Sequence, residues 1–169
     1  MGRTHEDLMR EALGIAATGL EAGELPIGAV VTLDGEVIAA RHTSEVATKR
    51  LLTHAELLAL EDAERLGLKR HREMRLYTTV EPCLMCLGAA MTFGVGAVIY
   101  ALPSPSDGAV ALVKGWPRDT AAFPTYQTPA FIADVLRRES AALFAEYVRR
   151  RTSGGLWAWA QSLLDATAR

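Results

Sequence analysis

Cysteine is scarce in this sequence. Its 169 residues contain two cysteines, Cys83 and Cys86, which lie three positions apart. Two cysteines this close together are too few to hold a small secreted scaffold by disulfides. The sequence is therefore not of the disulfide-rich class, and we expect a reducing, cytoplasmic setting.

Excess charge of either sign is also absent. There are 18 Lys and Arg residues against 20 Asp and Glu residues, a formal net charge of −2. This balance argues against nucleic-acid binding driven by overall charge. It leaves open a local basic patch, for which Arg149, Arg150 and Arg151 are the best candidates.

The sequence has no uninterrupted apolar span that we interpret as a membrane segment. Residues 82–106 carry no charge and are long enough to cross a bilayer, but Gly94 and Gly96 divide them, and Val98–Tyr100 has the composition of a strand. A buried helix followed by a buried strand accounts for the apolarity. The charged residues 1–10 are not followed by the apolar core of a signal peptide, so we expect no leader.

Half of the residues are hydrophobic, which is enough for one domain with a substantial core. We assign residues 1–153 to that domain and 154–169 to a C-terminal aromatic helix packed on it. Hydrophobic periodicity and turn signals predict helices over 6–21, 53–67, 82–93, 134–151 and 156–164, and strands over 27–33, 36–40, 76–80, 97–102 and near 130. Residues 103–129 hold five of the seven prolines and predict a long structured loop. This order predicts an α/β layered fold with a mixed sheet.

Two short clusters carry the candidate chemistry, and each opens a predicted helix. One contains His54 and Glu56, and the other contains Cys83 and Cys86 directly after Pro82. Residues three apart share a helix face, and thiols at a helix N-terminus have a lowered pKa that favours metal binding. Two thiolates and an imidazole suit zinc, and three protein ligands leave one position for water.

Glu56 is two residues from His54, so the two side chains do not share a helix face. A carboxylate that is not a ligand but lies beside a zinc-bound water is suited to proton transfer. The pattern predicts hydrolytic removal of a ring amino group, with Glu56 moving the protons.

These residues resemble the zinc-dependent deaminases of the cytidine deaminase superfamily, in the branch of bacterial tRNA adenosine deaminases and guanine deaminases. The resemblance covers roughly residues 6–151. It rests on Leu25–Val30, His54-Ala55-Glu56, Tyr77–Cys83, Pro82–Cys86 and Glu139–Leu143. It implies a three-layer α/β/α fold with a five-stranded mixed sheet, a bound Zn²⁺ ion and a homodimer. It also implies that His54, Cys83 and Cys86 are the metal ligands and Glu56 the proton shuttle.

One departure from the branch concerns substrate binding. Members carry an asparagine about eleven residues before the metal histidine, whereas this sequence has Thr43 there and contains no asparagine at all. We expect His42 or Thr43 to replace it and Asp107 to anchor a ring N–H. The other residues that we expect to contact substrate are Ile27 and Ala55.

Simpler interpretations accompany these predictions. Thr53–Glu56 also matches a helix capping box, and the cysteine pair alone is compatible with a redox pair or a closed structural zinc site. Trp157 and Trp159 are expected to dock the last helix onto the domain. An alternative is that this helix is a lid over the site, where one of its aromatic side chains stacks on a substrate base; Trp116 in the long loop is an equal candidate for that stacking.

Three functions follow from the sequence. The first is deamination of a small aminated ring, such as a free base or nucleoside. The second is deamination of adenosine in tRNA, which is disfavoured because the loop after Tyr100 lacks the charged, glycine-rich run that we associate with tRNA-acting enzymes. The third is a non-catalytic zinc module, against which the intact Glu56 speaks.

Overall fold

The computed structural model of the chain describes residues 2–68 and 72–167. Its helices are α1 (His5–Glu21), α2 (Glu45–Thr48), α3 (Ala55–Arg65), α4 (Leu84–Phe93), α5 (Val110–Gly115), α6 (Arg137–Arg149) and α7 (Gly155–Thr167). Its strands are β1 (Gly28–Leu33), β2 (Glu36–His42), β3 (Arg75–Val80), β4 (Ala97–Leu102) and β5 (Ala130–Ile132).

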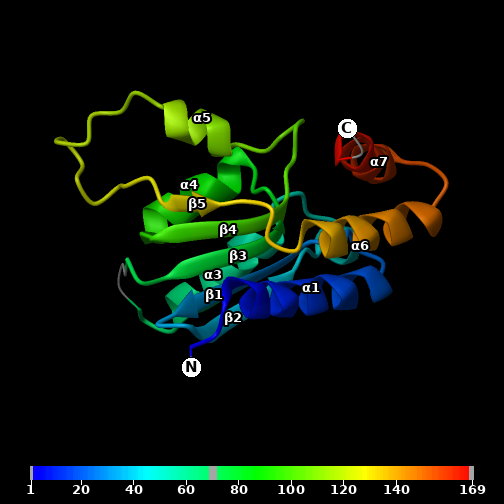
Figure 1. Ribbon diagram of the computed structural model, residues 1–169, viewed down its shortest axis with the longest axis horizontal. Helices are drawn as coiled ribbons and strands as arrows, with labels where there is room; N and C mark the ends of the chain where they lie inside the picture. Colours follow the sequence, from blue (N-terminus) through cyan, green and yellow to red (C-terminus); the bar gives the residue numbers. More distant parts are fainter. Residues whose placement is uncertain (1, 69–71, 168–169) are drawn as a thin grey trace.

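The strands form one five-stranded mixed sheet in the order β2-β1-β3-β4-β5 (Figure 1). β1 pairs antiparallel with β2 and β3, while β3–β4 and β4–β5 are parallel. Asp34 and Gly35 both have positive φ in the β1–β2 turn, as a tight hairpin of this kind requires. The predicted α/β/α fold with a five-stranded mixed sheet is confirmed.

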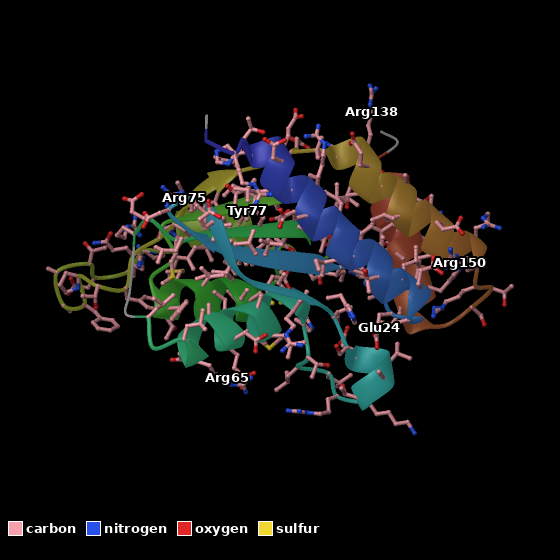
Figure 2. All side chains as sticks on the ribbon, turned by 90° about the horizontal axis from the view of Figure 1, so that it is seen from below. Glu24, Arg65, Arg75, Tyr77, Arg138 and Arg150 are labelled. Atoms are coloured by element: carbon pink, nitrogen blue, oxygen red, sulfur yellow. The ribbon has the colours of Figure 1, made fainter. Side chains whose placement is uncertain are left out.

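Helices cover both faces of the sheet. α1 and α6 lie side by side on one face, and α3 and α4 lie on the other (Figure 2). Alternation along the strands serves both layers: Val31 and Leu76 face the α3–α4 side, whereas Val30 and Tyr77 face α1. Every residue of β4 is buried, which explains the charge-free stretch in the sequence. No helix in the described ranges is long and apolar enough to cross a membrane.

A third apolar cluster closes one end of the molecule. Phe144 and Tyr147 of α6 pack there with Ala160 and Leu163 of α7 and with Val80 at the end of β3. This packing holds α7 beside the last residues of β3, where the chain continues into Glu81 and Cys83. The division of the chain at residue 154 stays a prediction.

The loops contain two short helices that the periodicity did not predict. α2 lies in the loop before His54, and α5 lies within the proline-containing segment 103–129. The helix predicted over 82–93, α4, begins at Leu84 rather than at Pro82, because Cys83 is its N-cap residue and has an extended backbone. Cys83 also pairs in an isolated bridge with Gly108, which ties the 103–109 loop to the start of α4.

A candidate metal centre and its pocket

Two helix N-termini meet at one end of the sheet. His54 is the N-cap residue of α3, and Cys83 is the N-cap residue of α4, with Cys86 in the first turn of α4. The Cys83 Sγ lies 3.7 Å from His54 Nδ1, the Cys86 Sγ lies 3.5 Å from the same nitrogen, and the two sulfurs are 3.6 Å apart. Among the described residues, this is the only group of three or more potential ligand side chains close enough to hold a metal ion.

The spacing of these three atoms fits zinc. Tetrahedral zinc with bonds of about 2.3 Å to sulfur and about 2.05 Å to nitrogen separates two sulfurs by about 3.8 Å and a sulfur from a nitrogen by about 3.6 Å. The observed distances agree with these values to within about 0.2 Å, and the donor set of two thiols and an imidazole is one that zinc prefers. His54, Cys83 and Cys86 therefore suit a zinc ion in both geometry and chemistry.

The protonation of the three side chains is strongly coupled. Hydrogen bonds from the Cys86 thiol and from His54 lower the pKa of Cys83 to about 4. The hydrogen bond to Cys83 raises the pKa of His54 to about 9, against the opposing effect of burial. The same sulfur contact, together with burial, raises the pKa of Cys86. These pKa shifts predict a Cys83 thiolate, a His54 imidazolium and a Cys86 thiol near neutral pH in the metal-free protein.

Glu56 lies directly behind this trio with 3% of its surface exposed. Its Oε1 accepts a hydrogen bond from Thr78 Oγ1 at 2.7 Å, and its Oε2 lies 3.5 Å from the Cys86 sulfur. Burial raises the pKa of this carboxyl group. A buried carboxyl held in one orientation, with a raised pKa, is suited to take up and return a proton.

The structure does not support the capping-box interpretation of Thr53–Glu56. α3 begins one residue later than that interpretation requires, so His54 rather than Thr53 is the N-cap residue, and no side chain caps the helix. The Thr53 hydroxyl instead donates back to the carbonyl of Arg50 at 2.9 Å. The motif therefore positions the imidazole at the helix start and leaves the Glu56 side chain free of a capping role.

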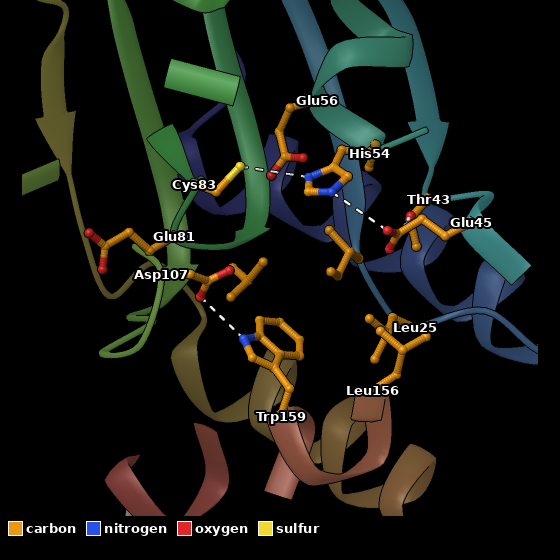
Figure 3. A pocket seen from close by; sticks show the side chains of 13 residues that line it. Leu25, Thr43, Glu45, His54, Glu56, Glu81, Cys83, Asp107, Leu156 and Trp159 are labelled. Atoms are coloured by element: carbon orange, nitrogen blue, oxygen red, sulfur yellow. Dashed lines mark hydrogen bonds and ion pairs between the residues drawn. The ribbon is translucent and has the colours of Figure 1, made fainter. Parts of the chain in front are cut away.

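A cavity of about 180 Å³ is lined by His54, Glu56 and Cys83 of this site (Figure 3). Of the side chains expected to contact substrate, four line it: Ile27, Thr43, Ala55 and Asp107. The lining also includes six residues that the sequence analysis did not assign to substrate: Leu25, Glu45, Val80, Glu81, Leu156 and Trp159. The cavity thus combines apolar walls with several carboxylates.

His42 does not line this cavity, and its expected contact with substrate stays a prediction. Adjacent residues on an extended backbone point to opposite sides. Thr43 faces the cavity, while the His42 ring packs close to Gly19 of α1 and its Nδ1 lies 2.6 Å from the Thr43 carbonyl oxygen.

The two tryptophans of α7 have different environments. Trp157 Nε1 donates to the carbonyl of Val148 on α6 at 3.2 Å, which docks the helix as expected. Trp159 lines the cavity together with Leu156, and its Nε1 donates to Asp107 Oδ1 at 3.2 Å (Figure 3). Trp116 lies elsewhere, in an edge-to-face contact with Tyr126. Trp159 also packs edge-to-face on Phe144 of α6, with ring centroids 5.8 Å apart, so it helps to dock the helix as expected and lines the cavity as well.

Residues 2–102 match the family of the cytidine and deoxycytidylate deaminase zinc-binding region. The match spans more than half of the chain, and the chain belongs to this family.

Individual relatives agree with that assignment. A tRNA-specific adenosine deaminase of Bacillus subtilis is 39% identical over 107 residues, which are 62% of this chain and 66% of that protein. The chain thus spans slightly less than two thirds of that relative. A structure from studies of A-to-I editing by tRNA:A34 deaminases is 34% identical, with a TM-score of 0.68 over 83% of this chain and 99% of the other. A guanine deaminase from Nitrosomonas europaea is 26% identical, with a TM-score of 0.68 over 87% and 85% of the two chains.

Proposed function

We propose that the protein is a zinc-dependent hydrolase that removes an exocyclic amino group from a small aminated heterocycle, such as a free base or nucleoside, and releases ammonia. The observation that carries this proposal is the trio of His54, Cys83 and Cys86 beside the buried Glu56, at a cavity that α7 covers. Membership of a deaminase family supports the reaction class.

The residues divide the chemistry between them. A zinc ion held by the three donors supplies a Lewis acid that lowers the pKa of a water molecule. Glu56 would take one proton from that water and deliver it to the ring nitrogen as the water oxygen bonds to the ring carbon. It would then take the second proton from the new hydroxyl group and pass it to the amino group, so that the C–N bond breaks and ammonia leaves. Thr78 holds one Glu56 oxygen, and the other lies 3.5 Å from the Cys86 sulfur, beside the position that the three donors leave for a metal ion. Leu25, Ile27 and Val80 supply an apolar surface against a flat ring, and Thr43 and Asp107 offer polar contacts to its edge.

A small substrate is favoured over tRNA by two features. Leu156 and Trp159 of α7 line the cavity. The basic run at the end of α6 also makes contacts within the protein. Arg149 and Arg150 both pair with Glu146. Arg150 pairs with Glu21 as well, and Arg151 donates a hydrogen bond to the Gly23 carbonyl. A phosphate would therefore have to compete with the carboxylate partners of Arg149 and Arg150.

The second candidate function is deamination of adenosine in tRNA. It is favoured by the similarity to the Bacillus subtilis protein and to the tRNA:A34 deaminase structure. A non-catalytic zinc module has less support, because a structural site has no use for Glu56 and the cavity beside it.

Ammonia release separates these functions. Zinc-loaded protein and its Glu56→Gln variant are incubated with aminated bases, nucleosides, pterins and triazines, and with a tRNA anticodon stem-loop. We expect turnover of a free ring in the parent protein and none in the variant. Turnover of the stem-loop alone, with binding that weakens steeply as salt rises, would replace our proposal with the second candidate.

Two further properties are part of this proposal. A homodimer fits the exposed apolar side chains of Leu84, Leu112 and Trp116, which surround a groove of about 410 Å³ over α4 and α5 that a second copy would cover. Light scattering on a size-exclusion column tests the dimer, and Leu112→Glu is expected to yield monomers.

A cytoplasmic location fits because Cys83 and Cys86 are free thiols 3.6 Å apart, and oxidation to a disulfide would destroy the ligand set.

A further inference from the structure

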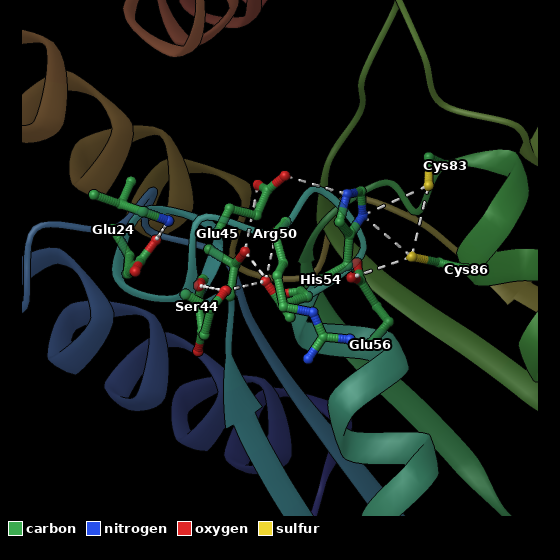
Figure 4. A network of polar contacts seen from close by, with 12 residues as sticks. Glu24, Ser44, Glu45, Arg50, His54, Glu56, Cys83 and Cys86 are labelled. Carbon is green, nitrogen blue, oxygen red and sulfur yellow. Dashed lines mark hydrogen bonds and ion pairs between the residues drawn. The ribbon is translucent and has the colours of Figure 1, made fainter.

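The two ring nitrogens of His54 face different partners. Nδ1 faces the sulfurs of Cys83 and Cys86, whereas Nε2 lies 3.7 Å from Glu45 Oε1 (Figure 4). A neutral imidazole carries one N–H, and the nitrogen that binds a metal must be the one without it. The ring therefore needs its proton on Nε2, on the side of Glu45.

Glu45 is poorly supplied with other hydrogen-bond donors. Its side chain is 17% exposed, so water satisfies it only in part. The Thr43 hydroxyl lies 3.5 Å from Glu45 Oε2, but that hydroxyl has a single proton and lies closer, at 3.1 Å, to the carbonyl of Thr53. Since the shorter contact takes the proton, the Nε2–H of His54 is the available donor for the Glu45 carboxylate.

A buried glutamate fixes the short helix that carries Glu45. α2 has four residues, and Ser44 at its N-cap makes no side-chain capping bond. Glu24, which is 1% exposed, performs that task from outside the helix: its oxygens accept from the backbone N–H groups of Val46 at 3.0 Å and Ala47 at 2.8 Å (Figure 2). The buried Glu24 carboxyl group thus holds the backbone directly after Glu45, and with it the position of Glu45 beside His54.

We propose that Glu45 is a positioning residue for the metal ligand His54. Its carboxylate lies at ion-pair distance from Nε2, 3.7 Å in this structure, and we expect it to close to hydrogen-bond distance of Nε2–H when metal binds. That bond would orient the ring and present an unprotonated Nδ1 to the metal. Carboxylate partners of metal-binding histidines act in this way in other metal sites. The inference rests on the zinc site of the proposed function and is independent of which ring is the substrate.

Zinc affinity and the protonated nitrogen of His54 test this assignment. Competition between the full chain and a fluorescent zinc chelator gives the affinity for Zn²⁺, and long-range proton–nitrogen NMR spectra of the zinc-loaded, ¹⁵N-histidine-labelled protein identify the protonated ring nitrogen. We expect Glu45→Ala to weaken zinc binding by about 10- to 100-fold. Glu45→Gln keeps an oxygen acceptor at the same reach and should lose less. The matched control is Glu61→Ala, which removes an exposed glutamate from α3 and should bind zinc as the parent does.

Each outcome bears on the assignment. Equal zinc affinity in Glu45→Ala and Glu61→Ala, or a parent protein whose His54 carries its proton on Nδ1, would overturn it. If Glu45→Ala does not fold, the zinc affinity of Glu45→Gln relative to Glu61→Ala still decides. The assay contains no ring substrate, so failure to find a deamination substrate leaves its result intact. Conversely, a normal turnover number and an unchanged zinc affinity in Glu45→Ala would reject the positioning role of Glu45. The proposed deaminase function would be unaffected by that result.

Discussion

Adding zinc to the metal-free protein at pH 7 is expected to release two protons for each ion bound. A metal-bound trio consists of two thiolates and a neutral imidazole. The Cys83 thiol, with its pKa near 4, has already lost its proton at pH 7. His54, whose pKa is raised to about 9, must lose one, and Cys86, whose pKa is also raised, must lose another.

This count fixes the pH dependence of zinc affinity. Two protons released per ion mean that zinc binding weakens about 100-fold, or by about 2.7 kcal/mol, for each unit of pH lowered below 7. As the pH rises through about 9, His54 becomes neutral before metal arrives, and the count falls from two toward one.

The same pKa shifts determine the stability of the metal-free fold. His54 has a folded pKa above its ordinary 6.5, so its contribution is complete below 6.5 and is lost as the pH rises through about 9. Cys83 has a folded pKa below its ordinary 9.0, so its contribution is lost as the pH falls through about 4. The metal-free fold therefore keeps the charged pair between about pH 4 and 9.

Isothermal titration calorimetry in buffers of different ionisation enthalpy measures the number of protons released. The Glu56→Gln variant is the form to titrate first, because it removes a buried carboxyl group whose raised pKa can add to the count. A count of one or zero in that variant at pH 7 would refute the thiolate–imidazolium description of the metal-free trio.

Three substitutions test other parts of the structure. Thr78→Val removes the hydrogen bond to Glu56 Oε1, so we expect kcat to fall about tenfold with little change in KM or zinc content. An unchanged kcat would show that this hydrogen bond does not orient Glu56. Phe144→Ala empties a fully buried position between α6 and α7 and should cost about 3–5 kcal/mol in the free energy of unfolding, measured by urea denaturation; a loss below about 1 kcal/mol would contradict the packing. Gly108→Ala places a Cβ 2.5 Å from the Ser104 carbonyl oxygen and 2.4 Å from Glu81 Cδ. The loop that carries Asp107 must then shift, and the Trp159 fluorescence should change. An unchanged fluorescence spectrum and melting temperature would show that the loop accommodates the methyl group.

The sequence predicted the parts of the structure that depend on local signals. Asp34-Gly35 marked the hairpin, and Gly94, with φ of 85°, ends α4 where the apolar helix pattern breaks. The spacing of Cys83 and Cys86 in one helical turn was also readable, because three residues span less than one turn. These features are set by residues close together in the chain.

The contacts that shape the cavity could not be read in the same way. Asp107 and Trp159 are 52 positions apart and meet only because α6 and α7 fold back over the end of the sheet. Glu45 lies in a four-residue helix too short to show periodicity, and it is held by Glu24, 21 positions earlier. The candidates His42 and Thr43 face opposite sides of the strand end, and Thr43 lines the cavity while His42 does not; the sequence pattern alone did not choose between them.

The covering helix α7 is the last element of the chain, and it follows α6 after a short linker that contains Gly154. The residues proposed to hold zinc and move protons all lie at the starts of α3 and α4, which precede it. The part of the cavity wall that α7 supplies is therefore encoded apart from the metal donors, whereas Ala55 and Val80 lie close to them in the sequence. Variation confined to positions 156 and 159 offers a route to new ring specificities that leaves the metal donors untouched, both for natural divergence and for a laboratory library.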